Sequence, residues 1–268
     1  MLEPFHLNYP TAMNRDLLKL IRQTLNRLGV DVIRYKDEKS TLNIPIDFQK
    51  KTISIINKVS QYTYTSPERI HALSEAVRYV SKYNIPGSIV ECGVWKGGSA
   101  MAAMYTLIEL GIQNRDFYLY DTYEGMPKPT DCDISINGEN ATYLFEKNKL
   151  EGKEWVYSSL DEVKTNILST GYDQNRIQFI QGKVEDTLIH TMPDSISILR
   201  LDTDWYESTM AEMKYLFPRL SKGGVLIIDD YGHWKGAQKA IDEYIEECSI
   251  QIHLSRIDYT GRLAIKLI

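Results

Sequence analysis

The stretch SIVECGVWKGGSA, residues 88–100, constrains the fold of this chain more than any other. Its apolar beginning is typical of a buried strand, and the small apolar residues that follow Ser99 predict a helix. Three glycines lie between the two, at positions 93, 97 and 98. Glycines in such a turn let backbone N–H groups close on a ligand without interference from a Cβ atom. A strand, a glycine-rich turn and a helix N-terminus favour a site for an adenosine-containing cofactor, although such turns also serve purely structural ends.

Strand-like and helix-like segments alternate from residue 88 to the end of the sequence. This alternation predicts an α/β fold whose sheet is mainly parallel and carries helices on both faces. The last two strands are joined by a short turn around residues 258–261, which forces them to run antiparallel. The predicted strands are 88–93, 116–121, 176–181, 195–202, 223–229, 250–256 and 262–267.

The N-terminal part of the chain does not follow this alternation. Leucine and isoleucine repeat at helical spacing over residues 15–28 and predict an amphipathic helix. We expect residues 1–60 to form a helical cap or oligomerisation segment, because this segment is too short and too polar to build a core of its own. Residues 61–268 would then form the α/β domain.

Two further features lie within the predicted domain. Ser66 is a good N-cap for a helix that begins at Pro67 and stops before Pro86. Residues 127–159 form a polar insert that exceeds an ordinary connection in length, which predicts a lid or a mobile loop.

The overall composition excludes several classes of partner. A formal net charge of −5 gives no electrostatic case for binding nucleic acid or an anionic membrane. Cys92, Cys132 and Cys248 are widely spaced, which fits a reducing compartment and argues against a disulfide framework or a thiolate metal site. The sequence has neither an apolar run long enough to span a bilayer nor a signal-peptide pattern. We therefore expect a cytoplasmic protein, and the oligomerisation segment predicted at residues 1–60 leads us to expect a homo-oligomer.

Acidic residues after the second and third predicted strands extend the cofactor pattern. Asp121 ends the run FYLYD, 24 positions after Gly97, where its carboxylate can accept hydrogen bonds from both ribose hydroxyls. Gly182 and Asp186 follow the third strand and could frame the edge of an adenine ring. Each acid has a structural alternative, because helix starts and loops are often acidic.

A second group of acids follows the fourth and fifth predicted strands. Asp202 comes directly after ISILRL, and Asp229 and Asp230 come after GVLII, so all three lie at the carboxyl ends of parallel strands. Carboxylates that converge in a partly buried site repel one another unless a cation neutralises them. An all-oxygen ligand set selects a hard ion, Mg²⁺ first, with Mn²⁺ or Ca²⁺ also possible. The alternative is that these acids cap a helix and begin a turn.

These motifs resemble those of known methyltransferases. The spacing E-x-G-x-x-x-G at the first turn is similar to motif I of class I S-adenosylmethionine (SAM) methyltransferases. The runs ECGVWKGGS, DTYEGMP, RLDTDWYEST and LSKGGVLIIDDYGHWKGA resemble the macrocin O-methyltransferase family (the TylF/MycF/NovP-related group) in the same order. The resemblance covers roughly residues 60–245.

The resemblance implies a fold, a reaction and a set of site residues. It implies a Rossmann-like class I sheet and transfer of a methyl group from SAM, with Mg²⁺, to a hydroxyl of a small-molecule or glycan acceptor, namely a sugar or a sugar-containing natural product or glycan. Known members of the family methylate sugar hydroxyls on antibiotic scaffolds. The resemblance assigns ribose recognition to Asp121. Residues 1–60 and 127–159 do not align, so the acceptor and the methylated position are not identified. The SAM-binding turn is assigned to Glu91, Gly93, Gly97 and Ser99, and metal ligation to Asp202, Asp229 and Asp230.

The expected mechanism follows from the charges. A cation lowers the pKa of a hydroxyl placed beside it. Asp202 is the first candidate to accept the proton, and His233 is a second residue that could accept it or orient the acceptor. The sulfonium of SAM then requires mainly alignment of the two reactants. Trp205, Tyr231 and Trp234 either stack on the acceptor or pack in the core.

Two other functions fit parts of the sequence. Asp202-Thr203-Asp204 matches the D-x-D pattern of glycosyltransferases that hold Mn²⁺ and a nucleotide sugar, but that pattern leaves Glu91, Ser99 and Asp121 without roles. A non-catalytic scaffold with the SAM fold is the second alternative. The presence of all three candidate metal ligands argues against it.

Overall fold

The computed structural model of the chain describes residues 43–152 and 155–267, and the helix predicted at 15–28 lies outside them. Within the described residues, one sheet of seven strands has the order β3-β2-β1-β4-β5-β7-β6. The first five strands pair in parallel, and β7 pairs antiparallel with both β5 and β6. The strands are β1 (Ser88–Cys92), β2 (Phe117–Asp121), β3 (Ile177–Gln181), β4 (Ile196–Leu201), β5 (Leu220–Ile228), β6 (Ser255–Arg256) and β7 (Arg262–Ile265).

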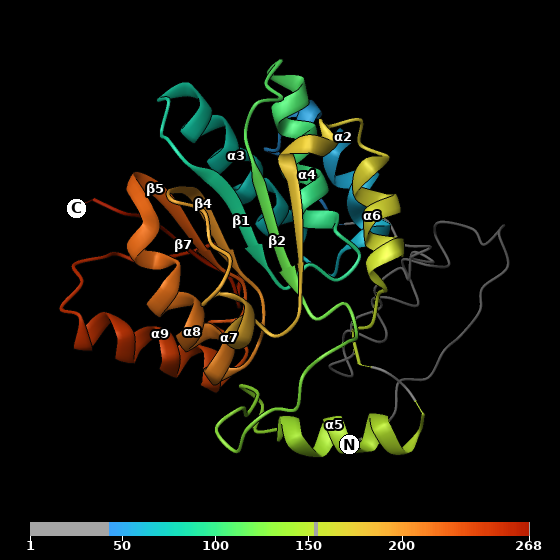
Figure 1. The fold of residues 1–268 in the computed structure, drawn as a ribbon, viewed down its shortest axis with the longest axis vertical. Helices are drawn as coiled ribbons and strands as arrows, with labels where there is room; N and C mark the ends of the chain where they lie inside the picture. The colour runs from blue at the N-terminus through green and yellow to red at the C-terminus, as the bar shows by residue number, and fades with distance from the viewer. Residues whose placement is uncertain (1–42, 153–154, 268) are drawn as a thin grey trace, which may run out of the picture. The chain divides into compact units, whose positions relative to one another are not determined.

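Helices cover both faces of this sheet (Figure 1). Successive side chains of a strand point to opposite faces, so Ile89 packs with one layer of helices and Val90 with the other. The first layer contains α2 (Lys50–Val59), α3 (Pro67–Lys82), α4 (Gly98–Glu109) and α6 (Leu160–Leu168). The second contains α7 (Val184–Thr187), α8 (Tyr206–Tyr215) and α9 (Lys235–Glu247). This architecture confirms the predicted α/β class I methyltransferase fold.

Most predicted strands exist, and their ends differ from the prediction for local reasons. The first strand ends at Cys92 because Gly93 takes a φ of +82°, which leaves the extended region. The prediction of a strand over residues 250–256 is wrong for residues 250–254, since only Ser255 and Arg256 pair with β7. Ile250, Ile252 and Leu254 alternate in sequence because their side chains pack against the second layer, without a ladder of backbone hydrogen bonds.

The N-terminal helices of the described chain share the core of the sheet. Ile55, Ile56 and Val59 of α2 are buried together with residues of α3 and α4. A compact unit begins at Asn43, so α2 belongs to it although it lies within the predicted N-terminal segment. The N-cap of α3 is confirmed, because the Ser66 hydroxyl accepts a hydrogen bond from the backbone N–H of Arg69 at 3.2 Å.

The insert of residues 127–159 contains α5 (Ala141–Leu150), which lies beyond the carboxyl ends of the strands (Figure 1). The buried carboxylate of Asp133 anchors the segment before α5 to the body of the protein. It accepts hydrogen bonds from the N–H groups of Thr130, at 2.7 Å, and of Tyr206 at the start of α8, at 2.8 Å. The other end of the insert is held by the hydrogen bond from the Trp95 indole N–H to the carbonyl of Tyr157, at 3.2 Å. That the insert acts as a lid remains a prediction.

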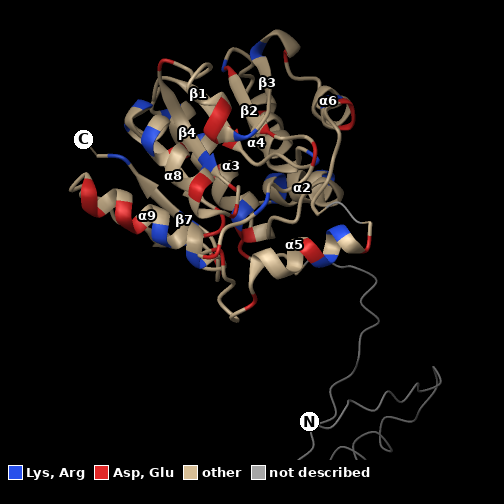
Figure 2. Ribbon diagram, turned by 60° about the horizontal axis from the view of Figure 1, so that its bottom comes forward, with Lys and Arg blue, Asp and Glu red and all other residues tan. Residues whose placement is uncertain are grey.

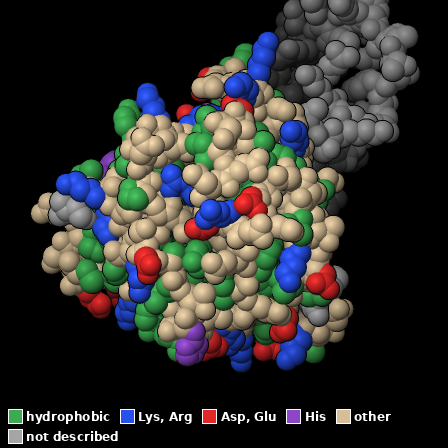
Figure 3. All heavy atoms as spheres, turned by 45° about the horizontal axis from the view of Figure 1, so that its top comes forward, with side chains coloured by type: hydrophobic (Ala, Val, Ile, Leu, Met, Phe, Trp, Pro, Cys, Tyr) green, Lys and Arg blue, Asp and Glu red, His purple; other side chains and the backbone are tan. Residues whose placement is uncertain are grey.

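The described surface mixes both signs of charge. Figure 2 shows acidic and basic residues interspersed along α5 and α9. The described side chains on the face drawn in Figure 3 likewise mix both charges with apolar groups. None of the helices within residues 43–152 and 155–267 is long and apolar enough to cross a membrane.

Candidate active site

A cavity of about 330 Å³ opens at the carboxyl ends of the parallel strands. Most of the predicted site residues line it, although they come from distant parts of the sequence. They are Glu91, Gly93, Ser99, Asp121, Gly182, Asp202, Asp229, Asp230 and His233. Gly97 and Asp186 do not line it: Gly97 caps α4 against Ile167, and Asp186 is exposed on α7 while its neighbour Glu185 faces the cavity.

Gly93 joins the glycine-rich turn to the acidic cluster. A Cβ atom at this position would lie 1.9 Å from the carbonyl oxygen of Asp202, and the backbone φ is +82°. Both facts require glycine. Gly98 is close-packed in the same way, since a Cβ there would lie 2.6 Å from the carbonyl oxygen of Tyr62. The segment before α3 therefore lies directly on the turn, and its Thr63, Tyr64 and Thr65 form one wall of the cavity.

The Asp121 carboxylate organises the loop after β1. Its Oδ2 accepts hydrogen bonds from the N–H groups of Val94 and Trp95, at 2.7 and 2.9 Å, and its Oδ1 accepts one from Tyr123 at 2.8 Å. An ionised carboxylate has about four acceptor positions. Most of that capacity is used within the protein, so Asp121 shapes the turn whether or not it also binds a ribose.

A buried arginine in β4 holds three acids of the site. Arg200 pairs with Glu91 through Nη1 at 2.7 Å, and through Nη2 with Asp202 and Asp229, each at 2.8 Å. Burial raises the pKa of Glu91 to about 7, although Arg200 acts in the opposite direction. Arg200 is not among the predicted site residues, although a charged residue inside the apolar run ISILRL is a signal for such a role.

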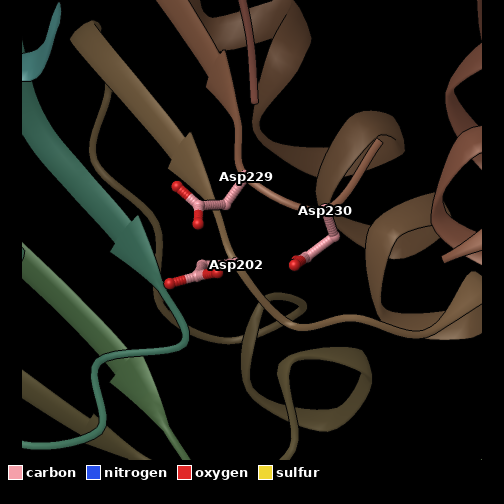
Figure 4. Close-up of side chains that lie close together, drawn as sticks. All are labelled: Asp202, Asp229 and Asp230. Carbon is pink, nitrogen blue, oxygen red and sulfur yellow. The ribbon is translucent and has the colours of Figure 1, made fainter. Parts of the chain in front are cut away.

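Asp202, Asp229 and Asp230 converge at the ends of β4 and β5, as Figure 4 shows. One oxygen of each lies within 4.8 Å of an oxygen of the others. Octahedral Mg²⁺, with bonds of about 2.0–2.1 Å, separates opposite ligands by about 4.2 Å. Three carboxylates at this spacing thus fit a hard divalent cation.

The protonation of the acidic cluster reflects its burial. Burial, reinforced by neighbouring carboxylates, raises the pKa of Asp230 well above its usual value. The pKa of Asp202 is also raised by burial, against the influence of Arg200. Asp204, which lies beside Asp230, has a pKa raised to about 7, again chiefly by burial. Carboxyl groups this close together in a buried site are stable only when protons, guanidinium groups or a metal ion neutralise their charge.

His233 lines the same cavity as these acids, and Trp205 and Trp234 lie near them in sequence. The His233 Nδ1 is 3.4 Å from the hydroxyl of Tyr259, and burial lowers the pKa of the imidazole. Trp205 is only 2% exposed and donates a hydrogen bond to the carbonyl of Pro127, and Trp234 is 6% exposed. These two indoles pack edge to face with each other and with Trp155. Trp205 therefore packs in the core, whereas Trp234 combines this packing with a place in the lining of the cavity.

Comparison with known proteins decides the family. The sequence profile described as macrocin O-methyltransferase (TylF) matches residues 17–264. The chain belongs to this family. It is a SAM-dependent O-methyltransferase, which argues against the glycosyltransferase and scaffold alternatives.

Individual relatives agree with this membership. The demethyldecarbamoylnovobiocin O-methyltransferase of Streptomyces niveus is 29% identical over 200 residues, which are 75% of this chain and 74% of the relative. A tetracenomycin enzyme of Streptomyces olivaceus, 8-demethyl-8-(2,3-dimethoxy-alpha-L-rhamnosyl)-tetracenomycin-C 4'-O-methyltransferase, is 32% identical over 200 residues, with coverage of 75% and 74%. The structure of the O-methyltransferase NovP superposes with a TM-score of 0.69 at 28% identity, covering 77% of this chain and 83% of NovP.

Proposed function

We propose that this methyltransferase transfers the methyl group of SAM to a sugar hydroxyl of a glycosylated natural product, with a divalent cation held by Asp202, Asp229 and Asp230. The observation that carries the proposal is the convergence of these three carboxylates within 4.8 Å, in the same cavity as the glycine-rich turn. The names of relatives support the acceptor class: that of the tetracenomycin enzyme includes a rhamnosyl group and a 4'-O-methyl transfer.

The cavity divides into two regions by chemistry. Gly93, Ser99, Asp121 and Gly182 surround the region next to the glycine-rich turn, which suits the nucleoside and amino-acid parts of SAM. Asp202, Asp230 and His233 surround the other region, which suits a polyhydroxylated acceptor. A ligand in each region would bring the methyl group and the hydroxyl together, and holding the two reactants in place supplies much of the rate enhancement.

The chain's own residues supply the proton acceptor. A divalent cation at the three carboxylates would lower the pKa of a neighbouring hydroxyl by several units. Asp202 lies in the cavity and is 27% exposed, which makes it the most accessible of the three acids to an acceptor. It accepts the proton in our proposal, with His233 as the alternative acceptor.

The proposal is tested by the metal dependence of methyl transfer. EDTA should abolish transfer to a rhamnoside acceptor, and Mg²⁺ should restore it. Asp202→Asn keeps the volume of the side chain but removes the proposed base, so turnover should fall about 10²-fold or more while SAM affinity changes little. The matched control is Asp194→Asn, which changes an exposed acid just before the first residue of β4, at the end of the strand opposite to Asp202. Full transfer in EDTA would exclude the cation, and normal turnover by Asp202→Asn would exclude this base.

A further inference from the structure

Arg69, in the first turn of α3, reaches into the acidic cluster from outside the sheet. Its Nη1 contacts Oδ2 of Asp229, and its Nε lies 3.0 Å from Oδ2 of Asp258 in the loop before β7. The side chain is 12% exposed, which is low for an arginine at the start of a helix. The opening turn of α3 is thereby tied both to the cluster and to the C-terminal hairpin.

Both oxygens of Asp229 are occupied by guanidinium groups. Oδ1 pairs with Arg200 and Oδ2 with Arg69. A divalent cation that uses Asp229 as a ligand must share one of these oxygens with an arginine or displace it. Two positive groups at one oxygen repel each other strongly in a buried site.

Arg200 and Arg69 differ in how readily each can move away from Asp229. Arg200 lies inside β4, is 3% exposed and is also paired with Glu91 and Asp202. Arg69 has an alternative partner outside the cluster, because Asp258 already accepts hydrogen bonds from its Nε and from the Ser66 hydroxyl, the latter at 2.7 Å. The N–H groups of Thr260 and Gly261 hold the other oxygen of Asp258 in place. Arg69 can therefore break its contact with Asp229 and remain paired with the carboxylate of Asp258.

We propose that Arg69 is an internal counter-cation that occupies Asp229 when no metal ion is bound and sets the affinity for the divalent cation by competing with it. On cation binding, Arg69 leaves Asp229 and remains paired with Asp258. Arg69 is thus a positioning residue for the metal site. This inference rests on the proposed function, because it requires that Asp202, Asp229 and Asp230 bind a cation.

The test measures binding of Mn²⁺ alone to the full chain, by electron paramagnetic resonance of the free ion, with neither SAM nor acceptor present. Arg69→Gln should lower the Kd for Mn²⁺ at least tenfold, because it removes the competing charge, whereas Arg69→Lys should stay closer to the unmodified protein. The matched control is Arg78→Gln on the same helix, which loses ion pairs with Glu75 and Glu109 and should leave the Kd unchanged.

A second variant keeps the inference testable if Arg69→Gln does not fold. Asp258→Asn removes the alternative partner, so Arg69 should stay on Asp229 and the Kd for Mn²⁺ should rise several-fold. An arginine with a purely structural role would not give tighter binding when it is lost. Unchanged or weaker binding by folded Arg69→Gln, or an unchanged Kd in Asp258→Asn, would overturn the role of Arg69 while leaving the metal site intact. Absence of Mn²⁺ binding to the unmodified protein would overturn the metal site itself.

Discussion

Asp121 shows how one residue can serve both the fold and a ligand. Its carboxylate holds the N–H groups of Val94 and Trp95, and so determines the path of the loop that faces the cavity. The sequence pattern predicts that the same carboxylate binds the ribose of SAM. Both roles need an ionised acid at the end of β2, so the sequence pattern alone does not separate them.

Asp121→Ala should weaken SAM binding by about 1–3 kcal/mol, because charge-assisted hydrogen bonds are lost from the loop, the ribose or both. Isothermal titration calorimetry measures the change. Asp116→Ala is the control and should bind SAM normally, because it changes an acid just before the same strand whose side chain is 44% exposed. Unchanged affinity in Asp121→Ala would refute the ribose assignment.

His233 should be neutral at pH 7, because burial disfavours its imidazolium form and lowers its pKa below the usual 6.5. The contribution of His233 to stability is full above the unfolded-state pKa of about 6.5 and is lost as the pH falls through the lower folded-state pKa. If His233 accepts the proton, kcat/KM should fall in the same range. NMR titration should give a midpoint below 6.5, and His233→Asn should remove this acid limb from the activity profile. A midpoint above 6.5, or an identical acid limb in the variant, would contradict the prediction.

At the scale of secondary-structure elements, Asp202, Asp229 and Asp230 meet because the paired strands β4 and β5 end next to each other. The insert contributes to the lining of the same cavity. Pro127 and Val156 of the insert line the cavity, as does Met126 just before it. Trp155 of the insert packs edge to face against Trp205, with ring centroids 5.6 Å apart. The hydrogen bond from the indole N–H of Trp95 to the carbonyl of Tyr157, at 3.2 Å, links the insert to the glycine-rich turn.

These contacts predict that the insert closes over bound ligands. Amide hydrogen exchange in residues 127–152 and 155–159 should slow when SAM and methyl rhamnoside are added. Trp155→Ala should reduce that protection and raise KM for the acceptor, because it removes the contact with Trp205. Leu150→Ala, at a side chain that is 88% exposed on α5, is the control. Equal exchange with and without the ligands would exclude a lid.

For the whole molecule, Arg200 is a buried charge that links three neighbouring strands of the sheet. It joins acids at the ends of β1, β4 and β5 in the centre of the sheet. Removing one partner from a buried ionic network leaves the others uncompensated, which costs about 3–5 kcal/mol. The predicted homo-oligomer and the cap formed by residues 1–60 remain predictions, which sedimentation of the full chain and of a chain lacking residues 1–42 would test.

Arg200→Met should therefore lower the free energy of unfolding in metal-free buffer by about 3–5 kcal/mol. Urea denaturation followed by circular dichroism measures this change. Arg176→Met is the control, because Arg176 forms an ion pair with Asp116 at the surface, where both side chains are exposed. A loss no larger than that of the control would show that the network contributes little to stability.

The sequence determined those parts of the protein that depend on local patterns. Strand and helix periods, the glycines of the first turn and the acids at strand ends are all visible within a few residues, and the parallel fold then brings those ends to one edge. Most of the predicted cavity residues, from Glu91 to His233, therefore meet as expected.

Only the tertiary structure decided which charges neutralise the cluster and which faces of the aromatic residues remain free. Arg69 lies 160 positions from Asp229, and no local period links them. Trp205 and Trp234 flank the acids in sequence, yet their indoles pack against Trp155 of the insert. Glu185 rather than Asp186 faces the cavity, because the single turn of α7 points adjacent residues in different directions. Side-chain partners depend on contacts between distant segments, and those contacts exist only after the chain has folded.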